Sequence, residues 1–97
     1  MPEPLRIVVF YRTEAGRELV REWLKGLSVE EQKHIGKELA KLQFYRRWPA
    51  GTARFLRDGL WELRVSVERR EALLLFFQDK DRLVLVPALW KRRERHR

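Results

Sequence analysis

The residues best suited to chemistry in this sequence are basic, and they occur at two places. Arg64 follows Glu62 by two positions, so the two side chains share a face if this segment is a strand. Lys91 and Arg92 are adjacent near the C-terminus. Guanidinium and ammonium groups bind a phosphodiester and stabilise the extra negative charge of its pentacoordinate transition state. These residues therefore favour chemistry on a polyanionic substrate.

RNA carries its own nucleophile, the 2′-hydroxyl group, and this reduces what a catalyst must supply. A catalyst has to orient the backbone for in-line attack, move two protons and neutralise charge, and these tasks need no metal. The sequence contains no nucleotide-binding fingerprint, P-loop, nucleophile elbow or cluster of metal ligands, and its two histidines are far apart. We therefore expect neither a metal nor a small-molecule cofactor.

The overall charge also favours a polyanionic partner. The chain has 22 Lys and Arg against 14 Asp and Glu, a net charge of +8 in 97 residues. Adaptation to high temperature is an alternative explanation, although it would balance the two signs better. The chain has no cysteine, no signal-peptide core and no apolar run of membrane-spanning length. We expect a soluble, cytoplasmic protein that does not bind a membrane.

The hydrophobic spacing predicts a single α+β domain over residues 1–97, with the element order β-α-α-β-β-β. The first strand covers residues 5–11. The first helix follows directly, with Thr13 as its N-cap and Gly26 near its C-terminal end. A capping box that starts at Ser28 begins the second helix, which forms a hairpin with the first.

Three strands are predicted in the second half of the chain, after an irregular loop over residues 45–58. They cover residues 61–67, 72–77 and 82–86. In the first of them apolar and polar residues alternate, so Arg64 should point away from the apolar face. A turn at residues 78–81 separates the last two strands, and Pro87 ends the final one. We expect an antiparallel sheet packed against the helical hairpin, followed by residues 88–97 as a short helix or a basic arm.

Several other basic or aromatic residues are candidates for RNA contact. They are Lys33, Lys37, Lys41, Arg54, Arg57, Trp90 and Arg93. The three lysines recur every four residues on one helical face, which either follows an RNA backbone or is simply the solvated side of the helix. The two arginines precede the strand that carries Arg64. The tryptophan either stacks on a base or packs against the domain.

Four segments of the chain carry a family resemblance. They are residues 9–13 (VFYRT), 20–24 (VREWL), 59–64 (GLWELR) and 89–92 (LWKR). In this order they resemble the phage-derived, HigB-type branch of the RelE toxin superfamily over nearly the whole chain, and GLWELR is the most specific of the four. The resemblance implies a RelE-like fold and a ribosome-dependent endoribonuclease that cuts mRNA and inhibits translation. It also implies a cognate antitoxin, usually a helix-turn-helix protein.

The resemblance implies roles for individual residues. Arg64 matches the arginine that ends the strand motif and would contact the phosphate and stabilise the transition state; the alternative is a cross-strand ion pair. Glu62 would orient Arg64 or act as a base, or it is only a salt-bridge partner. Lys91 and Arg92 match paired basic residues after the last strand and would engage the backbone or protonate the leaving oxygen, unless they form a solvated tail.

One departure from the family pattern leaves the activity open. Related sequences commonly have an arginine where this chain has residues 73–75, which are all leucine. The chain is then a slow enzyme, an enzyme that uses Arg69, Arg70 or Arg82 instead, or an inactive one. Two other functions therefore remain: a non-catalytic module that binds RNA or the ribosome, and a degenerate toxin whose main role is to bind an antitoxin.

Overall fold

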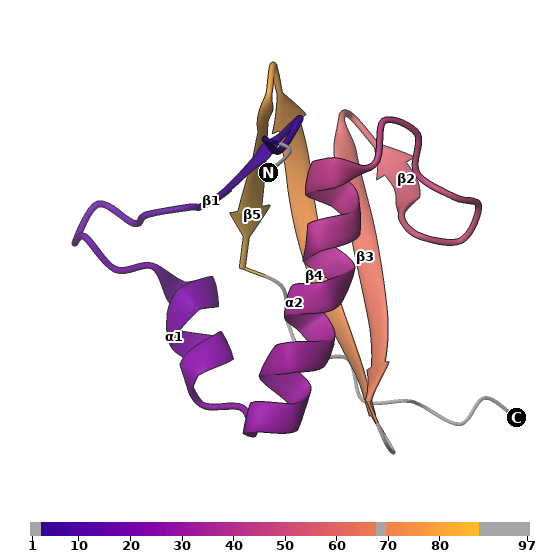
Figure 1. The fold of residues 1–97 in the computed structure, drawn as a ribbon. Coiled ribbons are helices and arrows are strands. Elements are labelled where there is room, and N and C mark those ends of the chain that lie inside the picture. The colour runs from indigo at the N-terminus through magenta and orange to yellow at the C-terminus, as the bar shows by residue number, and fades with distance from the viewer. Residues whose placement is uncertain (1–2, 68–69, 88–97) are drawn as a thin grey trace, which may run out of the picture.

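The computed structural model describes residues 3–67 and 70–87, in which two helices cover one face of a five-stranded sheet (Figure 1). The strands are β1 (Ile7–Phe10), β2 (Arg54–Arg57), β3 (Leu60–Val67), β4 (Arg70–Asp79) and β5 (Arg82–Val86). The helices are α1 (Leu19–Lys25) and α2 (Val29–Phe44). The predicted α+β, RelE-like class of fold is confirmed. In the described part of the chain, neither helix has the length and apolar character needed to span a membrane.

The strand order is β1-β5-β4-β3-β2, so the first strand lies beside the last. β1 runs parallel to β5, whereas all other neighbouring strands are antiparallel. The prediction of an antiparallel sheet is thus correct for every pair except this one, because β1 reaches the sheet through the helices rather than through a hairpin. The edge of β1 that does not pair with β5 contacts α2, where Gln43 Oε1 accepts a hydrogen bond from the Val8 N–H at 3.0 Å.

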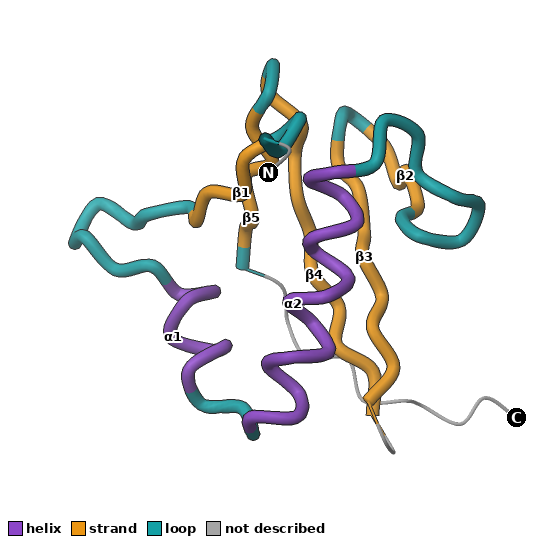
Figure 2. Tube along the Cα trace, viewed as in Figure 1, coloured by secondary structure: helices purple, strands orange, loops and turns teal. Residues whose placement is uncertain are grey.

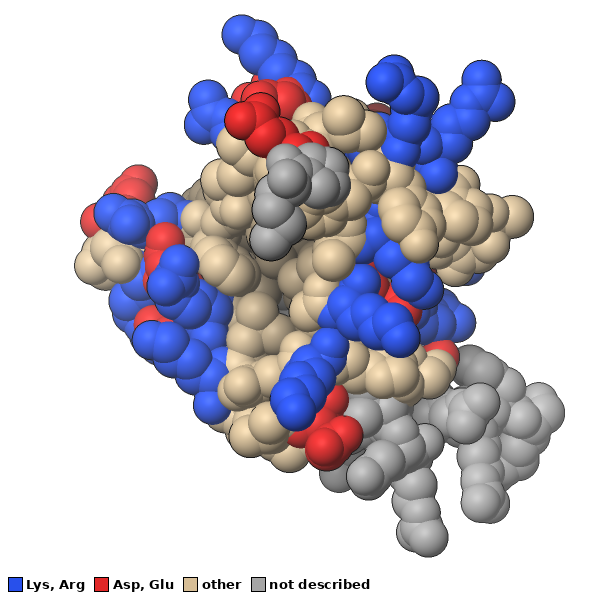
Figure 3. All heavy atoms as spheres, viewed as in Figure 1, with Lys and Arg blue, Asp and Glu red and all other residues tan. Residues whose placement is uncertain are grey.

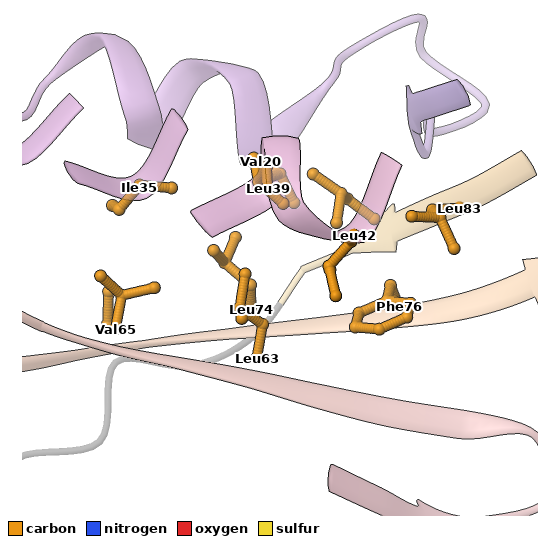
Figure 4. Close-up of a cluster of buried hydrophobic side chains, with 11 residues drawn as sticks. Val20, Ile35, Leu39, Leu42, Leu63, Val65, Leu74, Phe76 and Leu83 are labelled. Carbon is orange, nitrogen blue, oxygen red and sulfur yellow. The ribbon is translucent and has the colours of Figure 1, made fainter. Parts of the chain in front are cut away.

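The hydrophobic core lies between the helices and the sheet (Figure 4). Its buried members are Val20, Ile35, Leu39, Leu42, Leu63, Val65, Ala72, Leu74, Phe76, Leu83 and Leu85. An aromatic group extends the core toward β2, with the ring of Trp48 5.2 Å from Trp61 and 5.8 Å from Phe76, centroid to centroid. Because alternate residues of β3 and β4 face this core, the residues between them face the opposite side of the sheet.

The first helix begins later than predicted. Thr13 is not its N-cap, because α1 starts at Leu19 and the chain between β1 and α1 is a long loop (Figure 2). Gly16 has a φ of 85°, a left-handed conformation that interrupts a right-handed helix. A turn forms instead, in which the Thr13 N–H donates to the Arg17 carbonyl at 2.8 Å and the Arg17 N–H donates to Thr13 Oγ1 at 3.1 Å.

The predicted loop over residues 45–58 contains a strand that the sequence interpretation missed. β2 pairs with β3 through a two-residue turn, Asp58 and Gly59, whose φ angles are 51° and 77°. Two successive positive φ angles are what a type I′ hairpin turn requires, and Asp-Gly is a favoured sequence for it. β2 itself has only four residues and no buried one, so no hydrophobic alternation marked it as a strand.

The other element boundaries lie close to the predicted ones. The capping box at the start of α2 is confirmed: the Ser28 hydroxyl accepts from the Glu31 N–H and the Glu31 carboxylate accepts from the Ser28 N–H, both at 3.1 Å. Gly26 ends α1 as expected. β4 extends through residues 78 and 79, which were expected in a turn, so the reversal is centred on Lys80 with a φ of 56°.

Candidate functional site

Arg64 lies on the sheet face opposite the helices. Its neighbours Leu63 and Val65 point into the core and are 0% and 2% exposed, so Arg64 points the other way, and its side chain is 51% exposed. The predicted orientation is confirmed. We use the term Arg64 face for the surface formed by Arg54, Arg57, Glu62, Arg64 and Glu71.

Two carboxylates flank the guanidinium group of Arg64. Its Nη2 is 3.4 Å from Glu62 Oε1, and its Nε is 3.9 Å from Glu71 Oε2. Long ion pairs at an exposed guanidinium contribute at most about 1 kcal/mol to stability. A guanidinium has five N–H donors, so these two contacts leave donors available to a phosphate oxygen. The arrangement accommodates both the ion pair and the phosphate contact expected from the sequence.

Glu71 is a member of this site that the sequence interpretation missed. Its position beside Arg64 follows from the register of the β3–β4 hairpin, in which Val67 pairs with Arg70 and Ser66 with Glu71. The sequence predicts a turn at residues 68–70 and the next strand from residue 72, whereas β4 begins at Arg70 and so includes Glu71. A shift of one residue would move Glu71 to the other face of the sheet.

A bulge in β2 adds two arginines to the Arg64 face. Arg54 pairs with Glu62 and Arg57 with Leu60, with a register shift between the two pairs. In a regular strand Arg54 and Arg57 would point to opposite faces, because their spacing is odd. The shift places both opposite β3 residues that share the face of Arg64. Arg54 and Arg64 are therefore diagonal neighbours around Glu62, with Cβ atoms roughly 7–8 Å apart.

Leu73 is the residue directly across from Arg64 on β4. The departure from the family pattern therefore falls next to Arg64. Leu73 lines an apolar hollow of about 100 Å³ together with Trp23 and Val86, so the described residues on this side of Arg64 are apolar. The cations of the Arg64 face come from β2 and β3, and its three arginines and two glutamates leave a net charge of +1 (3 − 2).

The strand register decides which described cations can replace the absent arginine. Arg82 pairs with Asp79, six residues along β4 from Leu73 and thus about 20 Å away, too far to act on the same phosphate. Arg69 and the side chain of Arg70 lie outside the described residues. Arg54, which sits diagonally across from Arg64, is the described cation best placed for this role.

The structure places the lysine stripe of α2 on the other side of the sheet from Arg64. Lys33 and Lys37 are exposed on the helix that covers the core face, and Lys41 Nζ lies 3.0 Å from Glu38 Oε2. Figure 3 views this side of the molecule and shows Lys and Arg groups over the helices. The stripe and the Arg64 face are thus two separate basic surfaces. Trp90, Lys91, Arg92 and Arg93 lie outside the described residues.

A close ion pair beside α1 shifts the pKa values of its two members. The hydrogen bond from Arg17 lowers the pKa of the Glu22 carboxyl group, and the same bond raises the pKa of the Arg17 guanidinium. Both side chains are well exposed and lie away from Arg64. Within residues 3–67 and 70–87, no group of three or more His, Asp or Glu side chains is arranged to hold a metal ion.

The fold and the Arg64 face together define a small, basic α+β domain with arginines on an open sheet surface. The family model described as phage derived protein Gp49-like (DUF891) matches residues 22–95. The chain belongs to this Gp49-like family, which is a family of RelE/HigB-like toxins. The match includes the whole Arg64 face and most of the basic segment after β5. No curated protein and no solved structure matches the chain.

Proposed function

We propose that this protein is a HigB-type toxin that cleaves messenger RNA on the ribosome and thereby inhibits translation. The observation that supports the proposal most is the position of Arg64 on an open sheet face, with Arg54 beside it. Membership of a toxin family supplies the context. The substrate is an mRNA phosphodiester presented by the ribosome, and the antitoxin is the protein partner.

In the proposed reaction the 2′-oxygen of one nucleotide attacks the adjacent phosphorus atom. The P–O2′ bond forms while the P–O5′ bond breaks, which gives a 2′,3′-cyclic phosphate and a free 5′-hydroxyl. One proton leaves the 2′-hydroxyl and one is delivered to the 5′-oxygen, so neither water nor a cofactor is consumed. Arg64 donates hydrogen bonds to the non-bridging phosphate oxygens, where negative charge grows toward the transition state.

Glu62 and Arg54 support Arg64 in this reaction. The Glu62 side chain is only 14% exposed and its carboxylate lies 3.4 Å from Arg64 Nη2, so it restricts the orientation of the guanidinium. A carboxylate at this position is also available to accept the 2′-hydroxyl proton. Arg54, on the far side of Glu62, binds the phosphate backbone and compensates for the apolar Leu73.

The end of β5 lies near Arg64. Val86 pairs with Leu75, whereas Arg64 pairs with Leu73, so two strand spacings and two residues separate Val86 from Arg64. These correspond to about 10 Å and about 7 Å, a direct distance of roughly 12 Å. Five extended residues span roughly 17 Å, enough for Lys91 to reach the site. We assign proton delivery to Lys91 and a backbone contact to Arg92, because an arginine does not give up its proton.

Cleavage of ribosome-bound mRNA by the purified chain tests the proposal. We expect cleavage only when ribosomes are present, and products that end in a 2′,3′-cyclic phosphate. A matched mRNA with a 2′-deoxynucleotide at the mapped cleavage position should stay intact, because the nucleophile is missing. Intact natural mRNA on ribosomes, over a range of A-site codons, would show that the proposed activity is wrong.

A non-catalytic RNA- or ribosome-binding module is the second candidate function. Two features favour it: Glu62 and Glu71 offset most of the charge of the Arg64 face, and the segment of residues 73–75, where related sequences commonly have an arginine, places Leu73 across from Arg64. This function predicts ribosome binding that weakens steeply with salt while the mRNA remains uncut. The cleavage experiment therefore separates the two candidates.

A further inference from the structure

A groove runs between α1, α2 and β1 on the helix side of the molecule, opposite the Arg64 face. Its volume is about 360 Å³, and it is open to solvent along one side. The floor is apolar and consists of Phe10, Leu24, Ile35 and Leu39. Figure 3 shows uncharged atoms along this hollow and Lys and Arg atoms over α1 beside it. A solvent-open apolar groove with a charged border is typical of a protein-binding site.

Gly36 forms part of the groove wall, and the fold of the chain itself does not require a glycine there. Gly36 lies in the middle of α2, and a Cβ atom added to it would meet no other atom within 4 Å. Glycine in a helix interior costs roughly 0.5–1 kcal/mol relative to alanine. The free space at Gly36 lets another backbone approach α2 closely.

Arg21 and Lys25 border the groove from α1. The Arg21 guanidinium lies 5.0 Å from the centroid of the Phe10 ring and 2.9 Å, through Nε, from Glu18 Oε1, so it is held beside the apolar floor. Lys25 is exposed at the C-terminal end of α1. Positive charge on the border, in a chain of net charge +8, complements a partner with acidic side chains.

The polar groups of the groove do not suit a small polar ligand. Gln32 is the uncharged polar side chain in its lining, and its amide nitrogen already donates to the carbonyl oxygens of Leu24 at 2.9 Å and Leu27 at 3.3 Å. Pockets for small molecules usually present a few polar groups that converge on the ligand. An apolar floor also offers nothing to an RNA backbone. A helix with an apolar face satisfies both the floor and the close approach at Gly36.

We propose that this groove binds an amphipathic helix of a partner protein, with the apolar face of that helix on the groove floor and acidic residues beside Arg21 and Lys25. The inference goes beyond the proposed function, because it adds a protein-binding surface on the opposite side of the sheet from Arg64. A helix bound here leaves the Arg64 face uncovered.

Fluorescence polarisation with a labelled synthetic helix tests the proposal. The probe is a 16-residue peptide with leucines spaced i, i+3, i+4, i+7 and glutamates flanking them; a second peptide has lysines in place of the glutamates. We expect the acidic peptide to bind the full chain and to shift the amide NMR signals of Leu24, Lys25 and Gly36. The lysine peptide should bind at least tenfold more weakly.

Two substitutions with matched controls show whether the groove is the binding site. Gly36→Trp fills the groove and should weaken binding of the acidic peptide at least tenfold, whereas His34→Trp, an exposed position of α2 that does not line the groove, should bind like the original chain. Lys25→Glu should weaken binding, whereas Lys80→Glu, in the β4–β5 turn, should do so far less. Circular dichroism and thermal unfolding verify that each variant is folded.

The outcomes separate this inference from the proposed activity. Equal binding by Gly36→Trp and His34→Trp, or no binding of the acidic peptide to the original chain, overturns the groove proposal whatever the result of the cleavage assay. Tighter binding of RNA than of the acidic peptide at this groove, detected by the same NMR signals, also overturns it. Groove binding without any mRNA cleavage overturns only the proposed activity.

Discussion

Replacing Arg64 with alanine separates a catalytic role of this residue from a structural one. In the folded chain the change removes two ion pairs, at 3.4 Å and 3.9 Å, from a side chain that is 51% exposed. Exposed pairs of this kind contribute at most about 1 kcal/mol each, so the two together contribute at most about 2 kcal/mol. For a domain of this size, a loss of 1 kcal/mol lowers the Tm by roughly 4–8 °C, so we expect the Tm of Arg64→Ala to fall by no more than roughly twice this amount.

The expected effect on cleavage is much larger than the effect on stability. Removing one preorganised donor from a developing oxyanion typically lowers kcat by about 10²–10³, or roughly 2.7–4 kcal/mol. A domain with an ordinary stability of about 5–15 kcal/mol stays folded after losing about 2 kcal/mol. Unfolding therefore does not explain a hundredfold loss of activity, and such a loss would report on the reaction itself.

Single-turnover cleavage of ribosome-bound mRNA, measured beside thermal unfolding, is the appropriate assay. Arg64→Lys retains the charge but lacks the planar fork of N–H donors, so we expect an intermediate rate. Arg12→Ala is the matched control, because it removes an exposed ion pair of the same length, 3.4 Å to Glu18, outside the Arg64 face. If folded Arg64→Ala cleaves as fast as the Arg12→Ala control, the catalytic assignment is refuted.

Two further predictions concern stability and titration. Arg6→Ala should lower the free energy of unfolding, measured by urea denaturation, by about 1–3 kcal/mol. The reason is that Arg6 donates hydrogen bonds to the carbonyl oxygens of Leu42 at 3.0 Å and Tyr45 at 2.9 Å, near the C-terminal end of α2. A change below about 0.5 kcal/mol would contradict this role. Arg17→Ala should raise the pKa of Glu22, since the hydrogen bond from Arg17 is the main cause of its lowered value. Because the pKa of Glu22 is lower in the folded state, the Arg17–Glu22 pair stabilises the fold at pH values above the unfolded-state pKa of Glu22. This stabilisation is lost as the pH falls through the folded-state pKa. NMR titration of the Glu22 carboxyl carbon in the original chain and in Arg17→Ala measures the shift, and identical titration curves would contradict the prediction.

Local sequence signals were enough to predict the features that depend on one segment. The alternation in β3 places Arg64 opposite the buried Leu63 and Val65, because successive strand residues point to opposite faces. The capping box starts α2 at Ser28, because its hydrogen bonds join residues three positions apart. Prediction failed at Thr13, where the good capping residue is followed by Gly16 in a left-handed conformation.

The charge, the α+β class and the direction of the Arg64 side chain were thus determined by the sequence alone, because each follows from composition or from a short periodic pattern. Only the tertiary structure decided which residues surround Arg64. Glu71 reaches it through the hairpin register and Arg54 through the bulge in β2, and both depend on contacts between strands. The groove at Gly36 likewise exists only because α1, α2 and β1 pack together, which no single segment specifies.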